Sequence, residues 1–241
     1  MLRTILFDLD GTLVHFEFDD FLKAYLGAIS SKVAKLVDAR AFVAQLLAST
    51  EQMVKSLDPR KTNRDVFVDD FFPRLGRRED ELMPIFDAFY DEDFPSLRDT
   101  LSVEPHPLAR PMLEGLIDRG YEVVIATNPI FPAVAIEERM RWGGLDGIPY
   151  RHVTSYETSH FCKPNTEYYA EILNVVGRSP HECMMIGNDT CEDLVAGELG
   201  IITYLVEDYI LDRGPYRGSP DRRGRFEDLA QFLGSLAPVG A

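Results

Sequence analysis

The sequence predicts an α/β protein in which a parallel sheet, covered by helices on both faces, carries an inserted helical module. Short apolar runs alternate with helical patterns over the second half of the chain, as expected for the repeating units of a parallel sheet. One further apolar run stands at the N-terminus, and an all-helical stretch from about residue 19 to residue 94 separates it from the others. That stretch has apolar residues at three- and four-residue spacing and is too long for a loop, so we expect a separate helical module.

The expected strands are short apolar runs, mostly β-branched or aromatic, that end at polar or glycine-bearing turns. They are Thr4–Phe7, Glu122–Ala126, Cys183–Ile186 and Ile201–Val206, with a weaker candidate at Tyr150–Thr154. Helical patterns lie between these strands, and the first three of the four expected helices each end directly before a glycine. The expected helices are Pro111–Arg119, Glu167–Val176 and Glu192–Leu199, with a last one at Phe226–Leu236.

The position of the helical stretch predicts how the chain is divided. Residues 1–14 and 103–241 are expected to form the core, and residues 15–102 an all-helical cap domain. Residues 91–107, rich in acids and prolines, would be the hinge that returns the chain to the core. Residues 209–225 are polar and rich in glycine and proline, which is typical of a long surface loop.

Composition limits the partners and the compartment. The formal net charge of the 241 residues is −15, which argues against nucleic acid or an anionic membrane as the main partner. Three irregularly spaced cysteines, Cys162, Cys183 and Cys191, do not resemble a disulfide framework. The N-terminus lacks the apolar core of a signal peptide, and no stretch is long enough to span a membrane. We therefore expect a cytoplasmic protein, either a monomer or a homodimer.

The strongest chemical signal is the segment FDLDGT at residues 7–12. It follows the first expected strand, at the sheet edge where open α/β sheets bind their ligands. Asp8 and Asp10 stand two apart, and Gly11 gives the backbone freedom to turn. Four specified letters at roughly 5–7% frequency each give about one match per 100,000 positions, so chance is a poor explanation. A polar turn after a strand would explain one aspartate more easily than the whole pattern.

DLDGT in this position resembles the first motif of the haloacid dehalogenase superfamily, most of whose members are phosphatases. The three other motifs of that family also have matches, in the right order. Thr127, with Asn128 beside it, follows the second core strand; Lys163 precedes a helix in CKPN; and Asp189 and Asp193 stand four residues apart in MMIGNDTCED. The family pattern most often reads Gly-Asp at this acidic turn, whereas this chain reads Gly-Asn-Asp.

The resemblance implies a Rossmann-like core with a helical cap and a phosphatase that hydrolyses a small phosphorylated metabolite. Asp8 would be the nucleophile and form an aspartyl-phosphate, because a carboxylate can divide one hard step into two. Asp10 would be the general acid and base. Lys163 would add positive charge near Asp8, while Thr127 and Asn128 would bind the substrate.

The resemblance also implies a Mg²⁺ cofactor, since magnesium prefers oxygen ligands. Asp8, the backbone carbonyl of Asp10 and the acidic turn would hold it. Asp189 is the expected direct ligand, and Asp193 would bind through water or orient Lys163.

Three alternatives use the same fold. A 2-haloacid dehalogenase also has an aspartate nucleophile but needs neither a metal nor a protonated leaving group; the presence of Asp10 and of the acidic turn favours phosphoryl transfer. A phosphomutase would return the phosphoryl group to a sugar, and the motifs do not exclude it. A non-catalytic protein that binds a phosphorylated ligand would be expected to lose Asp8 or the metal acids, and this chain keeps them.

Overall fold

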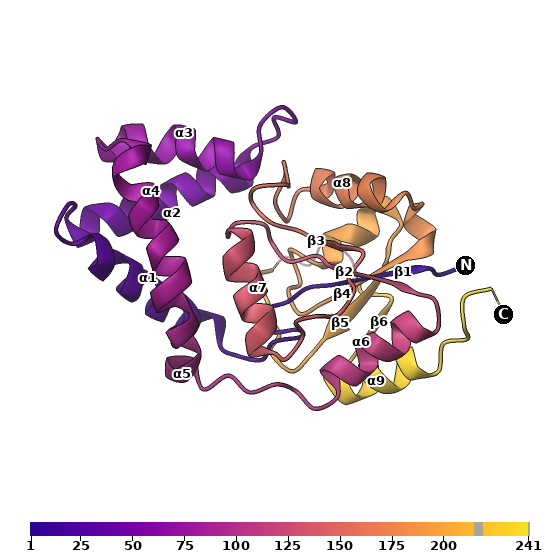
Figure 1. The fold of residues 1–241 in the computed structure, drawn as a ribbon. Coiled ribbons are helices and arrows are strands. Elements are labelled where there is room, and N and C mark those ends of the chain that lie inside the picture. Colours follow the sequence, from indigo (N-terminus) through magenta and orange to yellow (C-terminus); the bar gives the residue numbers. More distant parts are fainter. Residues whose placement is uncertain (215–218, 241) are drawn as a thin grey trace.

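The core of the protein is a six-stranded, all-parallel sheet with the strand order β3-β2-β1-β4-β5-β6 (Figure 1). The computed structural model describes residues 1–214 and 219–240. The strands are β1 (Thr4–Phe7), β2 (Glu122–Ile125), β3 (His152–Val153), β4 (Cys183–Gly187), β5 (Ile202–Val206) and β6 (Arg222–Gly224). The predicted fold class, a Rossmann-like α/β core with helices, is thereby confirmed.

The register of the central strands determines where the chain leaves the sheet. Phe7, the last residue of β1, pairs with Ile125 of β2 on one side and with Ile186 of β4 on the other. The residues that follow these three strands therefore emerge together at one edge. Three of the four expected signature segments follow these strands, so the register brings Asp8, Thr127 and Asp189 to a common edge.

Helices cover both faces of the sheet because consecutive strand residues point to opposite sides. Ile5 and Phe7 belong to a buried cluster that includes residues of α6 (Ala109–Asp118), α7 (Ala133–Trp142) and α9 (Phe226–Gly234). Leu6 belongs to a second cluster, formed with α8 (Thr166–Val176) and the 3-10 helix Leu194–Leu199. Figure 1 shows α8 on one side of the strands and α6 with α9 on the other.

Most of the residues between β1 and β2, those before α6, form a group of helices beside the sheet (Figure 1). They are α1 (Phe18–Val33), α2 (Ala39–Lys55), α3 (Asn63–Leu75), α4 (Glu79–Ala88) and α5 (Leu97–Leu101), here called the cap helices. Phe21 of α1 makes edge contacts with the rings of Phe131 and Trp142, which attach this group to the core. The exact domain boundaries stay a prediction.

Three sequence expectations need correction. The expected hinge at residues 91–107 is helical as far as Leu101, because a π-helical turn, Phe89–Asp93, and a 3-10 turn, Phe94–Ser96, join α4 to α5. The expected helix Glu192–Leu199 is a 3-10 helix that begins at Leu194. The expected loop at residues 209–225 contains the edge strand β6; residues 215–218 of that loop lie outside the described residues.

Two other sequence expectations concern disulfides and membrane spans. Cys162, Cys183 and Cys191, all within the described residues, form no disulfide. Within residues 1–214 and 219–240, no helix has both the length and the apolar character needed to cross a membrane.

Candidate functional site

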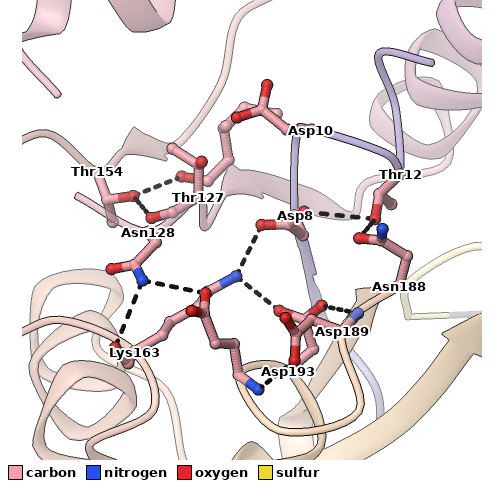
Figure 2. Close-up of polar contacts among 12 residues, drawn as sticks. Asp8, Asp10, Thr12, Thr127, Asn128, Thr154, Lys163, Asn188, Asp189 and Asp193 are labelled. Atoms are coloured by element: carbon pink, nitrogen blue, oxygen red, sulfur yellow. Dashed lines mark hydrogen bonds and ion pairs between the residues drawn. The ribbon is translucent and has the colours of Figure 1, made fainter. Parts of the chain in front are cut away.

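The centre of the site is a buried ammonium group held between two carboxylates (Figure 2). Asp8 follows β1 directly, and its backbone N–H donates to the carbonyl of Ile186 on β4 at 2.8 Å. Lys163 Nζ donates to Asp8 Oδ1 at 2.8 Å and to Asp193 Oδ1 at 2.6 Å. The Lys163 side chain is 0% exposed, so its charge acts directly on its two partners with little screening by water.

The electrostatics of this cluster favour a positively charged ligand. Burial alone would lower the pKa of Lys163, but Asp193 and Asp8 together raise it well above its ordinary value. Burial raises the pKa of Asp193 to about 6, although Lys163 opposes that shift. Burial also raises the pKa of Asp8, against the effect of Lys163 and with the help of Asp10 and Asp189. One ammonium therefore does not balance the two carboxylates that it contacts, Asp8 and Asp193.

The acidic turn after β4 is fixed by its own carboxylates. Asp193 Oδ2 accepts the backbone N–H of Asp189 at 2.9 Å. Asp189 Oδ1 accepts the backbone N–H groups of Cys191 and Glu192, both at 2.8 Å. The other oxygen, Asp189 Oδ2, is buried without a hydrogen bond and lies 3.1 Å from Arg213 Nε. The turn thus orients one oxygen of Asp189 that makes no hydrogen bond and is ion-paired with Arg213.

This arrangement requires glycine at position 187. A Cβ atom on Gly187 would lie 2.0 Å from Asp193 Oδ2. We expect Gly187→Ala to lower the free energy of unfolding by about 1–3 kcal/mol, because the added methyl must displace the Asp193 carboxylate. Urea denaturation measures this, with Gly27→Ala as the control: a Cβ on Gly27, in α1, meets nothing within 4 Å. Equal stability of the two variants would contradict the close packing described here.

The donor set fits magnesium. The described part of the chain contains no group of three or more His, Cys, Asp or Glu side chains arranged to hold a metal ion. The expected site needs fewer side chains, because Mg²⁺ keeps several waters and commonly takes one or two protein carboxylates. Asp8 and Asp189 would supply these, with the backbone carbonyl of Asp10. The buried Asp189 Oδ2, which lacks a hydrogen bond, is the kind of oxygen a hard cation would satisfy.

Asp10 is paired with a residue that the sequence did not single out. Its carboxylate forms an ion pair with Arg139 of α7, which is 1% exposed. The guanidinium lies over the ring of Phe131, 4.7 Å from its centroid. Burial raises the pKa of Asp10, and Arg139 opposes that rise. Asp10 Oδ1 makes no hydrogen bond, and Figure 2 shows the Asp10 carboxylate pointing away from the pair of Asp8 and Lys163.

The segment after β2 is held by its backbone. The carbonyl of Thr127 accepts the hydroxyl of Thr154 at 2.7 Å and that of Tyr168 at 2.8 Å. Asn128 Nδ2 donates to Glu192 Oε2 at 3.0 Å, and Asn128 Oδ1 is buried without a partner. Burial, then Asp189, raises the pKa of Glu192 to about 7. Glu192 was not among the expected site residues, and its carboxyl ties Asn128 to the acidic turn.

A second hydrogen-bonded group supports the loop that contains Asp8, Gly11 and Thr12. Thr12 Oγ1 donates to Asn188 Oδ1 at 3.0 Å and lies 3.5 Å from Asp8 Oδ2. Asn188 Nδ2 donates to the carbonyl of Tyr209 at 2.5 Å. Gly11 has a φ of 78°, and a Cβ atom there would lie 2.4 Å from Asn188 Nδ2. The additional Asn of Gly-Asn-Asp therefore joins the first motif to the acidic turn.

These side chains surround a cavity of about 100 Å³. Six of the seven expected site residues line it: Asp8, Asp10, Thr127, Asn128, Asp189 and Asp193. Lys163 is not part of the lining and contacts it through Asp8 and Asp193. The structure thus brings all seven residues together, and their individual roles stay predictions.

The fold is similar to several solved structures, all at low sequence identity. A HAD phosphatase from Thermococcus onnurineus is 17% identical with a TM-score of 0.62, covering 99% of this chain and 100% of that one. A predicted phosphoglycolate phosphatase from Haemophilus somnus 129PT is 19% identical with a TM-score of 0.58, covering 96% and 97%. The L-2-haloacid dehalogenase from Xanthobacter autotrophicus with covalently bound chloropropionic acid is 16% identical with a TM-score of 0.59, covering 98% and 100%.

A comparison with curated proteins gave no significant match. A family model of haloacid dehalogenase-like hydrolases matches residues 2–199, which include every expected site residue. Because that match extends over most of the chain, the protein belongs to the haloacid dehalogenase-like hydrolases.

Proposed function

We propose that the protein is a magnesium-dependent phosphatase that hydrolyses a small phosphomonoester through an aspartyl-phosphate on Asp8. The main support is Asp10, a buried carboxyl with a raised pKa that lines the same cavity as Asp8. An alcohol leaves a phosphate ester only with a proton, whereas a halide leaves as a stable anion. A second acid of raised pKa that lines the same cavity as Asp8 therefore favours phosphoryl transfer over dehalogenation.

The residues divide the reaction into two balanced steps. Asp8 attacks phosphorus with the oxygen that Lys163 does not hold, forming a new P–O bond while the bond to the alcohol oxygen breaks. Asp10 gives that oxygen its proton. Asp10 then takes a proton from water, which attacks phosphorus and releases inorganic phosphate and the Asp8 carboxylate. When bound, magnesium would neutralise charge on the phosphoryl oxygens.

Burial and Arg139 shift the pKa of Asp10 in opposite directions, and each shift favours the form of Asp10 that one of the two steps needs. Burial favours the protonated acid required in the first step, and the guanidinium favours the carboxylate required in the second. The stacking of Arg139 on Phe131 and Phe21 fixes this cation in place. The negative net charge of −15 fits a small-molecule substrate better than a nucleic acid.

Removal of magnesium tests the proposal. Protein treated with chelator should release no phosphate from an aryl phosphate, and added Mg²⁺ should restore the release. The reason is that Lys163, Arg139 and Arg213 already have carboxylate partners, so they leave the charge of the phosphoryl group unbalanced. The measurement is phosphate release alongside chloride release from 2-chloropropionate. Full phosphatase activity after thorough chelation contradicts the metal dependence. Chloride release in the absence of any phosphatase activity contradicts the phosphatase itself.

A further inference from the structure

A larger cavity adjoins the catalytic one, between the cap helices and the core. Its volume is about 570 Å³, which is within the range of pockets that hold whole organic ligands. The two cavities share lining residues, among them Phe18, Asn128, Phe131 and Arg213. A substrate whose phosphate reaches Asp8 would therefore extend the rest of its structure into this space, here called the cap chamber.

The side chains that the cap helices contribute to the chamber are predominantly apolar. Leu26 of α1, Val54 of α2, Val68 of α3 and Met83 of α4 line it, each only half-buried. Phe67 adds an aromatic face. Apolar surface that an occupant removes from water stabilises the complex in proportion to its area, so this lining favours an apolar occupant.

The charged groups of the chamber disfavour a second anion on the substrate. Among the described lining residues the cations are Arg64 and Arg213. Arg64 Nη2 donates to Glu79 Oε1 at 2.6 Å, while Arg213 pairs with Asp189 at 3.1 Å and with Glu192 at 3.2 Å. Each guanidinium thus already has a carboxylate partner.

Among the described lining residues, the other ionisable groups bring no further positive charge. The chamber's other ionisable acids include Asp87 and Glu157. The phenol of Tyr25 also lines it, and burial raises the pKa of Tyr25 to about 12, so this hydroxyl stays neutral. A carboxylate or second phosphate placed here would lose water and meet like charge.

We propose that the substrate is the phosphate monoester of a bulky, largely apolar alcohol without a second anionic group, its carbon skeleton filling the cap chamber. This inference rests on the proposed phosphatase function and names its substrate class. It excludes small esters that carry a carboxylate besides the phosphate, such as phosphoglycolate, as good substrates. It also disfavours sugar phosphates, because their hydroxyls would find few free polar partners.

Three esters of primary alcohols test the preference with a similar leaving oxygen: 2-naphthylmethyl phosphate, ethyl phosphate and phosphoglycolate. We expect kcat/KM for the naphthylmethyl ester to exceed that for phosphoglycolate by roughly 100-fold or more. Equal values, or a preference for phosphoglycolate, overturn the substrate class while leaving the phosphatase function in place. Hydrolysis of no ester contradicts the phosphatase function instead.

A matched pair of variants on α2 locates the preference in the chamber. Thr50 lines the chamber, whereas Ala48 on the same helix is exposed and does not. Thr50→Trp should lower the ratio of kcat/KM for the naphthylmethyl ester over the ethyl ester by about 10-fold, and Ala48→Trp should not.

Direct binding gives an answer independent of turnover. Calorimetry with 2-naphthylmethanol should detect binding to the unaltered protein and to Ala48→Trp, and weaker binding to Thr50→Trp. Equal binding to all three proteins, or binding to none, overturns the proposal whatever the kinetics show.

Discussion

Asp8→Asn should form no phosphoenzyme at all, whereas Asp10→Asn should form it and fail to release it. An amide at position 8 is too weak a nucleophile to attack phosphorus, so we expect kcat to fall by roughly 10,000-fold or more. An amide at position 10 removes the proton donor, but an aryl phosphate with a good leaving group needs little proton donation. Water attack then lacks a base, so the acyl phosphate should accumulate and kcat should fall by about 100- to 10,000-fold.

Acid-quenched intact mass after mixing with an aryl phosphate distinguishes the two variants. Asp20→Asn is the control, since Asp20 is an exposed aspartate at the start of α1. Near-ultraviolet circular dichroism should confirm that each variant keeps its fold, which matters for Asp10 because Arg139 would lose its charge partner. Phosphorylated Asp8→Asn contradicts the covalent mechanism. Water that attacks phosphorus places solvent oxygen in the released phosphate, so solvent oxygen found in the Asp8 carboxylate contradicts the second step.

The convergence of the expected site residues was predictable because it depends on local patterns and one general property of parallel sheets. Asp8, Thr127 and Asp189 each follow a short apolar strand, and such strands end at a common edge. Phe7 pairs with Ile125 and with Ile186, so the ends of these three strands lie at the same level of the sheet. Local sequence therefore contained enough information to place the acids, though not to assign their roles.

The partners of these residues were not predictable, because long-range pairing has no local signal. Arg139 lies 129 residues from Asp10 in the sequence. It belongs to the segment EERMR, whose four charged residues are typical of a helix surface exposed to water. Its full burial depends on Phe21 and Phe131, which come from other parts of the chain. The raised pKa of Glu192 likewise follows from tertiary burial. Charge in a helix is normally exposed, and sequence alone gives no reason to expect otherwise.

Sequence analysis did not identify strand β6, helix α7 or the helical turn from α4 to α5. Strand β6 reads Arg-Arg-Gly, and its arginines are exposed because it is the edge of the sheet. Nothing apolar distinguishes it from the loop around it. The turn from α4 to α5 contains acids and Pro95, which suggested a hinge, yet Phe89 and Phe94 are fully buried and hold it in helical conformations. Burial of two aromatic rings outweighs the local preference.

Lys163→Met should reduce kcat by roughly 1,000-fold, because it removes a buried positive charge that adjoins the nucleophile. Methionine keeps much of the lysine volume, so the substitution tests charge more than packing. The same change leaves Asp8 and Asp193 as buried carboxylates without a partner. We expect the free energy of unfolding at neutral pH to fall by about 3–5 kcal/mol. Lys61→Met, at an exposed lysine paired with Asp69, is the control.

The pH dependence of stability separates lost charge from lost packing. Burial already raises the pKa of Asp8 and of Asp193, and without Lys163 these pKa values rise further. The folded variant then holds protons that the unfolded chain releases near pH 4, so its free energy of unfolding should fall as pH rises above that value. Urea denaturation should therefore show a larger difference from the unaltered protein at pH 8 than at pH 5. A difference that does not change with pH would mean that Lys163 contributes packing, and near-normal kcat/KM would remove it from the proposed mechanism.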